Sequence, residues 1–293
     1  MQNATFVITT ARSGTQWLCK SLQAIFPDLL VAEHEPIGYA CAPKRCLRDP
    51  AASAALRAEP VVQQHLNRIH DVLRHKSYIE VGFPAFAAAP LLAAEFGTRL
   101  RLVQLVRHPV RVAASIVTHR WFDPSQRDDI KADIALAPTD PGVRLLQHYC
   151  EQWPNMSPFE KALFYWAEVH LYGLEVRDEL PAVPFLQLTF EDLLADSAAR
   201  ERLAAFLSVP YRPAWNDAPA IRIDEQRRVT MHTINPSEVH KHPEIVALAE
   251  RFGYDVDDIR ERLFRIRYRG SWIRRTRCQL KRAFPHVAKI LGH

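Results

Sequence analysis

The sequence contains 293 residues, of which 48% are hydrophobic and 24% are charged. This composition is typical of a globular protein and excludes an extended disordered chain. The length suits one large α/β domain about as well as two small ones. The net charge of +5 arises at the C-terminal end, since the first 259 residues sum to −5.

Membrane and redox signals favour a soluble chain. No apolar run reaches the roughly 18 residues that a membrane-spanning helix requires. The N-terminus enters an apolar run without a preceding basic or cleavable segment, so we expect a cytoplasmic protein. An odd number of cysteines without a C-x-x-C pair favours neither a disulfide scaffold nor a zinc site; they are Cys19, Cys41, Cys46, Cys150 and Cys278.

Hydrophobic patterns predict strands and helices in alternation along the chain. The predicted strands cover residues 6–10, 29–32, 78–81, 100–106 and 185–190. The predicted helices cover residues 16–26, 61–75, 84–96, a segment from 109, 159–179 and 243–252, with a loop or short helices over 40–60. This alternation predicts an α/β fold with a mainly parallel sheet and right-handed crossovers.

The first strand and helix enclose a candidate anion-binding loop. Ser13, Gly14 and Thr15 are small, so backbone amides and hydroxyls there can approach an anion closely. The following helix directs its positive end at the same place, and Arg12 adds a full charge. The pattern predicts a phosphate-binding loop, with a purely structural turn as the alternative.

This loop differs from the P-loop of nucleotide triphosphatases, G-x-x-x-x-G-K-[ST]. That motif would need glycine at position 9 and lysine at position 15, where this chain has Thr9 and Thr15. No lysine is therefore placed to bridge the β- and γ-phosphates of a nucleotide.

A second unit covers residues 102–115. Its strand ends in Arg107, a turn follows, and Pro109 occupies the first position of the next helix, where proline is well placed. Ser115 lies eight residues after the arginine, on that helix.

The sequence R-S-G-T-Q-W-L after the first strand resembles the 5′-phosphosulfate loop of sulfotransferases, and residues 102–115 resemble the 3′-phosphate motif of that family. The two motifs occur in the family's order, about ninety residues apart. The resemblance implies a P-loop-kinase-like three-layer fold, with residues 1–259 as the sulfotransferase domain. It also implies that 3′-phosphoadenosine 5′-phosphosulfate (PAPS) donates a sulfuryl group in line to a hydroxyl of an acceptor, without a metal.

The resemblance assigns donor-binding roles. The amides of Ser13, Gly14 and Thr15 would hold the 5′-phosphate, with the side chains of Thr15 and Gln16 in support. Arg12 would stabilise charge on the bridging oxygen, and being permanently protonated it cannot donate a proton. Arg107 and Ser115 would hold the 3′-phosphate; a strand-end ion pair and a helical serine against a neighbour are the structural alternatives.

Two further groups of residues could complete the nucleotide site. Trp17 and Phe190 match positions whose rings contact adenine, although Trp17 could equally belong to the core. The Arg-Lys-Gly triplet that closes over the 3′-phosphate in cytosolic sulfotransferases is absent, and Arg227 and Arg228 are its candidate substitutes unless they are simply solvated.

The catalytic base is the largest departure from the family. Cytosolic sulfotransferases use a histidine at the end of the third strand, where this chain has Gly82. Carbohydrate and tyrosylprotein sulfotransferases place a glutamate after the second strand, often before a proline, and Glu35 followed by Pro36 fits this pattern. We therefore predict Glu35 as the base.

Other assignments of the base stay open: His34, Glu33 and Glu80 are alternatives, and Glu35 could merely pair with an arginine. Strict alternation along a strand places His34 on the face opposite Glu33 and Glu35. Burial would raise the pKa of Glu35 and a nearby Arg12 would lower it, which leaves the direction open.

The acceptor is expected to be a small molecule, a carbohydrate or a lipid. The irregular stretch over residues 123–158 is longer than most connections and favours a lid or an acceptor-binding region. From residue 260 to the end, eleven Lys and Arg residues stand against Glu261, a local charge of +10. We treat residues 260–293 as a basic segment that is either plainly solvated or contacts an anionic membrane surface or acceptor, with nucleic acid less favoured.

Two other functions stay in view. A P-loop kinase would bind ATP with magnesium, although the lysine that its motif needs is missing. A non-catalytic nucleotide- or polyanion-binding module would bind the donor product without turnover.

Overall fold

The computed structural model describes residues 2–123, 133–220, 234–259, 264 and 268. Its centre is a five-stranded sheet in the order β2-β3-β1-β4-β5, in which every pair of neighbours is parallel. The strands are β1 (Ala4–Ile8), β2 (Leu30–Glu33), β3 (Ser77–Glu80), β4 (Leu100–Val106) and β5 (Phe185–Thr189). The predicted α/β fold with a parallel sheet is confirmed.

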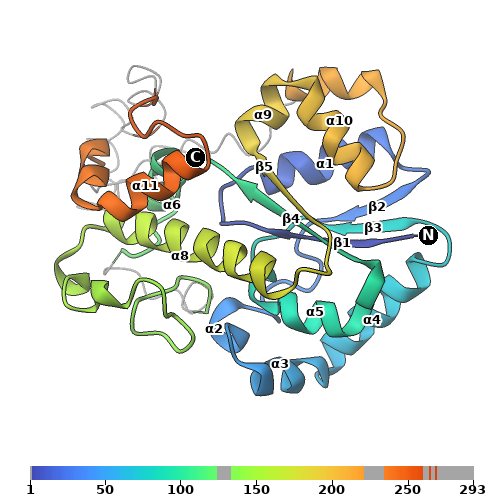
Figure 1. Cartoon of the computed structure of the whole chain (residues 1–293), viewed down its shortest axis with the longest axis horizontal. Coiled ribbons are helices and arrows are strands. Elements are labelled where there is room, and N and C mark those ends of the chain that lie inside the picture. The colour runs from blue at the N-terminus through green and yellow to red at the C-terminus, as the bar shows by residue number, and fades with distance from the viewer. Residues whose placement is uncertain (1, 124–132, 221–233, 260–263, 265–267, 269–293) are drawn as a thin grey trace, which may run out of the picture.

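Helices cover both faces of the sheet and make three layers (Figure 1). One face carries α1 (Thr15–Ile25), α9 (Phe190–Ala195) and α10 (Ser197–Phe206). The other face carries α4 (Pro60–Val72), α5 (Ala89–Phe96), α6 (Pro109–Thr118) and α8 (Pro158–Glu179).

The alternation of β1 side chains divides the core into two clusters. Phe6 and Ile8 pack into the larger cluster with α4, α5, α6 and α8, whereas Val7 packs into the smaller one with α1 and α10. Because α1 and α6 lie on opposite faces, the loops after β1 and β4 leave the sheet in opposite directions. Ligands of open parallel sheets bind at such a switch point.

Shorter helical elements complete the described part of the chain. They are α2 (Pro43–Cys46), α3 (Pro50–Arg57), η1 (Phe86–Ala88), η2 (Gly97–Arg99), η3 (Gln147–Cys150), η4 (Trp153–Asn155), η5 (Pro213–Ala220), η6 (Pro236–Lys241) and α11 (Pro243–Arg251). The short helices expected over residues 40–60 are therefore present as α2 and α3.

Side-chain hydrogen bonds account for two of the strand ends that differ from the prediction. The first strand ends at Ile8 instead of residue 10, because Thr9 Oγ1 donates to Leu105 O and the Thr10 hydroxyl pairs with that of Ser13. The last strand ends at Thr189, whose hydroxyl caps α9 by accepting from Asp192 N at 3.0 Å. Side-chain hydrogen bonds of this kind compete with the sheet ladder.

Helix α8 shows how local sequence sets a boundary near the site. Ser157 accepts a hydrogen bond from Glu160 N, and the Glu160 carboxylate accepts one from Ser157 N, which is a capping box. Pro158 then occupies the first helical position. The helix starts one residue before the predicted one and lies across the larger core cluster.

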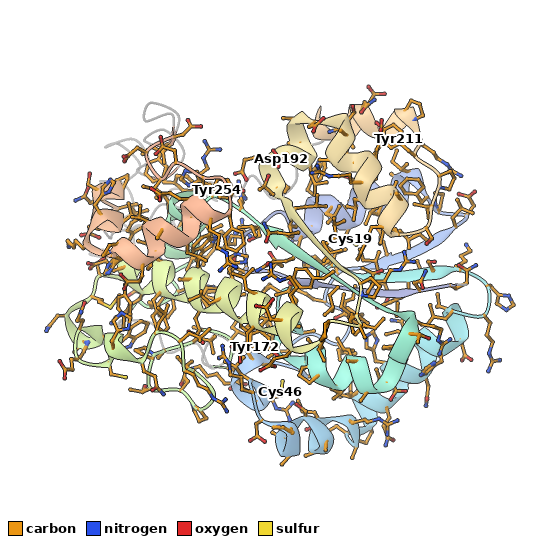
Figure 2. All side chains as sticks on the ribbon, viewed as in Figure 1. Cys19, Cys46, Tyr172, Asp192, Tyr211 and Tyr254 are labelled. Carbon is orange, nitrogen blue, oxygen red and sulfur yellow. The ribbon has the colours of Figure 1, made fainter. Side chains whose placement is uncertain are left out.

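The described cysteines Cys19, Cys41, Cys46 and Cys150 are free thiols. Cys19 and Cys46 lie on opposite sides of the sheet (Figure 2). Burial raises the pKa of both Cys41 and Cys46 to about 12, so these thiols are unreactive at neutral pH.

Two of the sequence predictions fall largely outside the described residues. Arg227 and Arg228 lie outside them, as does most of the basic segment 260–293. Phe264 and Tyr268 of that segment are described, and both are buried in the larger core cluster. Within the described ranges, no helix is both long enough and apolar enough to cross a membrane.

Candidate anion-binding site at the carboxyl edge of the sheet

The loop between β1 and α1 has an unusual backbone. Arg12 and Gly14 both adopt positive φ, at 69° and 89°. At Gly14 a Cβ atom would also collide with the ring of Phe190, so only glycine fits. A positive φ at a non-glycine residue such as Arg12 is uncommon and is concentrated at functional sites.

The first turn of α1 faces this loop. Among the described residues, no side chain caps the N-terminus of α1. Its first amides are therefore left for another acceptor, and the helix dipole favours an anion there. Ser13 and Thr15 are buried beside them, whereas the Gln16 side chain is exposed.

The two sequence motifs meet at this point. Arg12 Nε donates to Ser115 Oγ at 3.1 Å, and Arg107 Nη1 donates to the backbone oxygen of Arg12 at 2.7 Å. Thr9 adds a hydrogen bond from its hydroxyl to Leu105 O at 2.7 Å. Two guanidinium groups and a hydroxyl therefore converge beside the loop, and cations placed in this way can pair with more than one anionic group.

Arg107 is held from several sides. Its guanidinium lies over the Phe190 ring, 4.9 Å from the ring centre. Its backbone oxygen accepts from Trp166 Nε1 at 2.9 Å. The Glu191 carboxylate approaches Arg107 Nε only to 4.0 Å, so the strand-end ion pair foreseen as an alternative is a loose contact.

Trp17 and Phe190 contact each other edge to face, with ring centres 5.6 Å apart. Trp17 is 5% exposed and donates from Nε1 to Ala218 O, and Phe190 is 7% exposed. Both belong to the smaller core cluster. Trp17 thus has the core position that the sequence left open, and its contact with adenine stays a prediction.

Glu35 lies two residues after the end of β2, and its side chain is partly buried. Its φ is 52°, and its side chain lies over Gly82, where a Cβ would be 2.9 Å from Glu35 Cγ. Burial, together with the negative charge of Glu80, raises the pKa of Glu35 to about 7, although a hydrogen bond from the backbone of Phe83 opposes this. The opposing effects left open by the sequence thus resolve toward a raised pKa, while Arg12 is hydrogen-bonded to Ser115.

His34 lies beside Glu35, contrary to the prediction from strict alternation. His34 Nε2 is 3.4 Å from Glu35 Oε1 and 3.0 Å from Thr15 Oγ1. The alternation fails because β2 ends at Glu33 and the positive φ of Glu35 reverses the chain. Burial lowers the pKa of His34, which keeps the imidazole neutral near pH 7.

Glu33 and Glu80, the other two candidate bases, are engaged in a hydrogen-bond network with residues of α4 and β3. Glu33 accepts from Arg68 Nη1 at 2.7 Å and from the Tyr78 hydroxyl at 2.8 Å. Arg68 also donates to His65 Nδ1, so His65 is fixed as the tautomer that donates from Nε2 to Glu80, at 2.8 Å. These contacts engage Glu33 and Glu80 with other side chains, whereas Glu35 lies beside His34, which contacts Thr15 of the anion loop.

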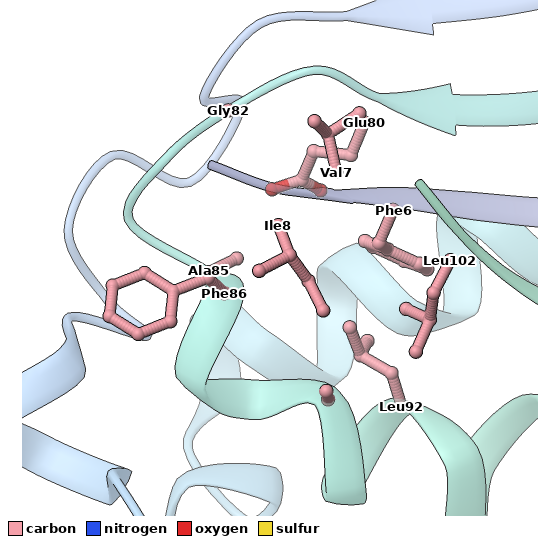
Figure 3. A pocket seen from close by; sticks show the side chains of 10 residues that line it. Phe6, Val7, Ile8, Glu80, Gly82, Ala85, Phe86, Leu92 and Leu102 are labelled. Carbon is pink, nitrogen blue, oxygen red and sulfur yellow. The ribbon is translucent and has the colours of Figure 1, made fainter. Parts of the chain in front are cut away.

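The apolar crevice beside Glu80 is closed. Figure 3 shows it lined by Phe6, Ile8, Phe86, Leu92 and Leu102, with Glu80 and Gly82 at one end. It leaves no room for a water-sized sphere. It is therefore part of the core and not a ligand site.

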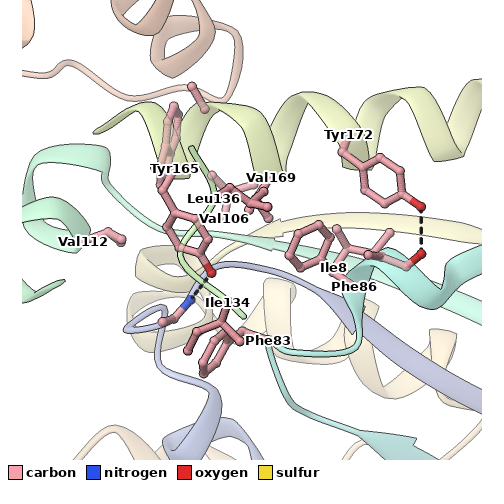
Figure 4. Close-up of a cluster of buried hydrophobic side chains, with 14 of the residues drawn as sticks. Ile8, Phe83, Phe86, Val106, Val112, Ile134, Leu136, Tyr165, Val169 and Tyr172 are labelled. Atoms are coloured by element: carbon pink, nitrogen blue, oxygen red, sulfur yellow. Dashed lines mark hydrogen bonds between the residues drawn. The ribbon is translucent and has the colours of Figure 1, made fainter. Parts of the chain in front are cut away.

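Tyr165 on α8 was not among the residues predicted from the sequence. The Tyr165 hydroxyl accepts a long hydrogen bond of 3.5 Å from Ala11 N in the anion loop (Figure 4). Its ring continues a row of aromatic contacts with Trp121, Phe83 and Tyr39. A buried tyrosine needs a partner for its hydroxyl, which is the signal that could have found it.

Within the ranges that the structure describes, no three His, Cys, Asp or Glu side chains form a group able to hold a metal ion.

Comparisons with known proteins identify the fold. No family model matches the chain, and no curated protein matches its sequence. Among solved structures, the sulfotransferase domain from the curacin biosynthetic pathway aligns with a TM-score of 0.50 at 15% identity, over 87% of this chain and 99% of that one. The sulfotransferase domain of the Synechococcus PCC 7002 olefin synthase aligns with a TM-score of 0.50 at 16% identity, over 87% and 96%. The chain therefore has the P-loop-kinase-like fold of the sulfotransferases, as its two motifs implied.

Proposed function

We propose that the protein is a sulfotransferase that moves the sulfuryl group of PAPS to a hydroxyl of an acceptor. The observation that carries this proposal is the meeting of the two motifs, in which Arg12 bonds to Ser115 and Arg107 bonds to the backbone of Arg12. A donor with phosphates at both the 5′ and the 3′ positions needs two adjoining anion sites, and this arrangement supplies cations to both.

The donor is assigned to the carboxyl edge of the sheet. The free amides at the start of α1, with Thr15 and Gln16, bind the 5′-phosphate. Arg107 and Ser115 bind the 3′-phosphate, a group that ATP lacks. This assignment is supported by the positive φ of Arg12 and Gly14, which brings the loop backbone close to any anion bound there.

Transfer itself requires alignment and charge stabilisation. The sulfuryl group passes in line between two oxygens, and negative charge builds on the bridging oxygen as its bond to sulfur breaks. Arg12 lies in the loop where it can stabilise this charge, but it cannot act as a proton donor.

Glu35 is assigned as the base that takes the proton of the acceptor hydroxyl. Its pKa of about 7 places the carboxylate near the value that suits a base at neutral pH. Its position next to His34 and Thr15 supports the assignment, because the acceptor oxygen must approach the sulfuryl group held by the donor loop.

The acceptor is assigned to carbohydrates or glycolipids. Glu35 followed by Pro36 resembles the carbohydrate enzymes, and the partly buried ring of Tyr39, 6.3 Å from that of Phe83, lies in the loop after Glu35. Aromatic rings suit the apolar face of a sugar. Contact of the basic segment 260–293 with an anionic membrane remains part of this proposal.

The decisive experiment is calorimetric titration with 3′-phosphoadenosine 5′-phosphate (PAP), beside 5′-AMP and Mg-ATP. We expect tight binding of PAP that requires the 3′-phosphate and is lost in Arg107→Ala. The control is Arg101→Ala, because Arg101 lies on the same strand at its opposite end.

Two results would overturn the proposal. Absence of a preference for the 3′-phosphate, with binding of Mg-ATP, would favour a kinase. PAP binding without transfer to any member of a broad acceptor panel would favour a non-catalytic binding module.

A further inference from the structure

One imidazole nitrogen joins the donor loop to Glu35. His34 Nε2 is 3.0 Å from Thr15 Oγ1 and 3.4 Å from Glu35 Oε1. In a neutral imidazole this nitrogen is either a donor or an acceptor at any moment, never both. Thr15 and Glu35 belong to segments that follow different strands, and the contact between them runs through His34.

We propose that His34 is a positioning residue that couples the hydroxyl of Thr15 to the charge of Glu35. This inference rests on the proposed function, since Thr15 is assigned to the donor phosphate and Glu35 to the acceptor proton. It adds that binding of a phosphate in the donor loop and ionisation of Glu35 depend on each other.

The coupling follows from the hydrogen bonds available in each state. An ionised Glu35 can only accept, so the Nε2–H of His34 donates to it and the Thr15 hydroxyl can donate to an anion in the loop. A protonated Glu35 donates instead, and Nε2 becomes an acceptor that also competes for the Thr15 hydroxyl. A phosphate that accepts a hydrogen bond from the Thr15 hydroxyl therefore favours the arrangement in which Glu35 is an ionised base.

Other charged or titratable groups around Glu35 are Glu80 on β3, Tyr165 on α8 and Tyr39 in the loop that follows Glu35. Glu80 acts on Glu35 through its negative charge, and burial raises the pKa of Tyr165, which keeps it neutral. Arg12, in the donor loop, is bonded to Ser115. These groups set the charge around Glu35. The contact with the Thr15 hydroxyl is made by His34.

The test is a double-mutant cycle read by PAP affinity at about pH 8, where Glu35 with its pKa of about 7 is mostly ionised. The substitutions are Thr15→Val and Glu35→Gln, made singly and together, in the natural chain and in His34→Ala. In the natural chain we expect Thr15→Val to weaken PAP binding about tenfold. When Glu35→Gln is also present, the factor by which Thr15→Val weakens binding should be smaller by about threefold or more. In His34→Ala we expect Thr15→Val to weaken PAP binding by the same factor whether position 35 is glutamate or glutamine.

Two outcomes would overturn the inference. In the first, Thr15→Val weakens PAP binding in the natural chain by the same factor with glutamate and with glutamine at position 35. In the second, the two factors differ in the natural chain and still differ in His34→Ala. A purely structural role of His34 would weaken PAP binding while leaving the factors unchanged, so it belongs to the second outcome. If His34→Ala does not fold, His34→Gln takes its place, because the amide has separate donor and acceptor atoms and should also lose the coupling. Failure of the natural chain to bind PAP would instead overturn the proposed function.

Discussion

Arg12 Nε donates a hydrogen bond to Ser115 Oγ at 3.1 Å, although the two residues are 103 positions apart in the chain. The contact ties the loop after β1 to the helix after β4. An anion bound by one of these side chains would therefore also lie beside the other. Binding at the two motifs should be thermodynamically linked through this pair.

Ser115→Ala tests that link. The variant removes the acceptor of Arg12 and one proposed ligand of the 3′-phosphate, so we expect PAP affinity to fall about five- to tenfold, with little change for 5′-AMP. The measurement is calorimetric titration with both nucleotides. Thr118→Ala is the matched control, because the Thr118 hydroxyl lies on the same helix and bonds only locally, to Ser115 O and to the adjacent His119. Equal losses for PAP and 5′-AMP in Ser115→Ala would contradict the assignment.

The raised pKa of Glu35 has opposite consequences for activity and stability. In the folded protein the pKa is about 7, against an ordinary value of 4.5. The folded state thus holds this proton more tightly than the unfolded chain, and stability is lost as pH rises from about 4.5 to about 7. Activity should rise over the upper part of the same range, because transfer needs the ionised base.

Glu35→Gln separates the two effects. We expect the variant to lose turnover, to bind PAP only a few-fold more weakly, and to be more stable than the natural protein at about pH 8 by up to about 3 kcal/mol. At about pH 4 the two proteins should unfold with the same free energy. Urea unfolding at both pH values and transfer to a glycan acceptor are the measurements. Retained turnover would remove Glu35 from the role of base.

The strand–loop–helix units could be predicted from the sequence because each rests on a strong local signal. The apolar run before Arg12 and the one before Arg107 are buried strands, and parallel strands bring their carboxyl ends to one edge. This geometry made the meeting of Arg12, Arg107 and Ser115 predictable.

The base region was less predictable because it depends on single backbone angles and on tertiary packing. The positive φ of Glu35 places it with His34, which no alternation rule foresees. The hydroxyl of Tyr165 reaches Ala11 only because α8 packs across the sheet beside that loop. Such contacts join distant segments, so a local pattern cannot supply them.

Gly82→Ala should displace the base without touching the donor loop. A Cβ at this position would be 2.9 Å from Glu35 Cγ and 3.3 Å from Glu35 N, and the φ of Gly82 is one that alanine accepts. We expect kcat to fall about tenfold or more while PAP affinity is kept, since small misplacements of reacting groups are costly. Steady-state kinetics and calorimetry together give this separation.

The double variant Gly82→Ala with Glu35→Gln is the control. If alanine acts through Glu35, it should cost nothing further once the carboxylate is gone. An additional loss of the same size would show that Gly82 acts on some other part of the site.

Arg48 supports the site from a distance by joining three segments. Its side chain is 4% exposed and donates from Nε to Glu175 at 2.8 Å, from Nη1 to Glu168 at 2.8 Å and from the same nitrogen to Gly142 O at 2.6 Å. The two glutamates lie on α8, the helix that also carries Tyr165. Replacing Arg48 would leave Glu168, whose side chain is fully buried, without its cation.

Arg48→Met should therefore lower the free energy of unfolding by about 3–5 kcal/mol, the usual cost of an uncompensated buried charge. Arg57→Met is the control, because Arg57 is 57% exposed in its pair with Glu95 and should cost less than about 1 kcal/mol. Urea unfolding measures both. Burial raises the pKa of Glu168, and losing the cation would raise it further, so the deficit of Arg48→Met should shrink as pH falls from neutral toward about 4.5. A deficit that stays constant with pH would mean that Arg48 acts through packing against Tyr172, whose ring centre is 5.0 Å from its guanidinium carbon, and not through its charge.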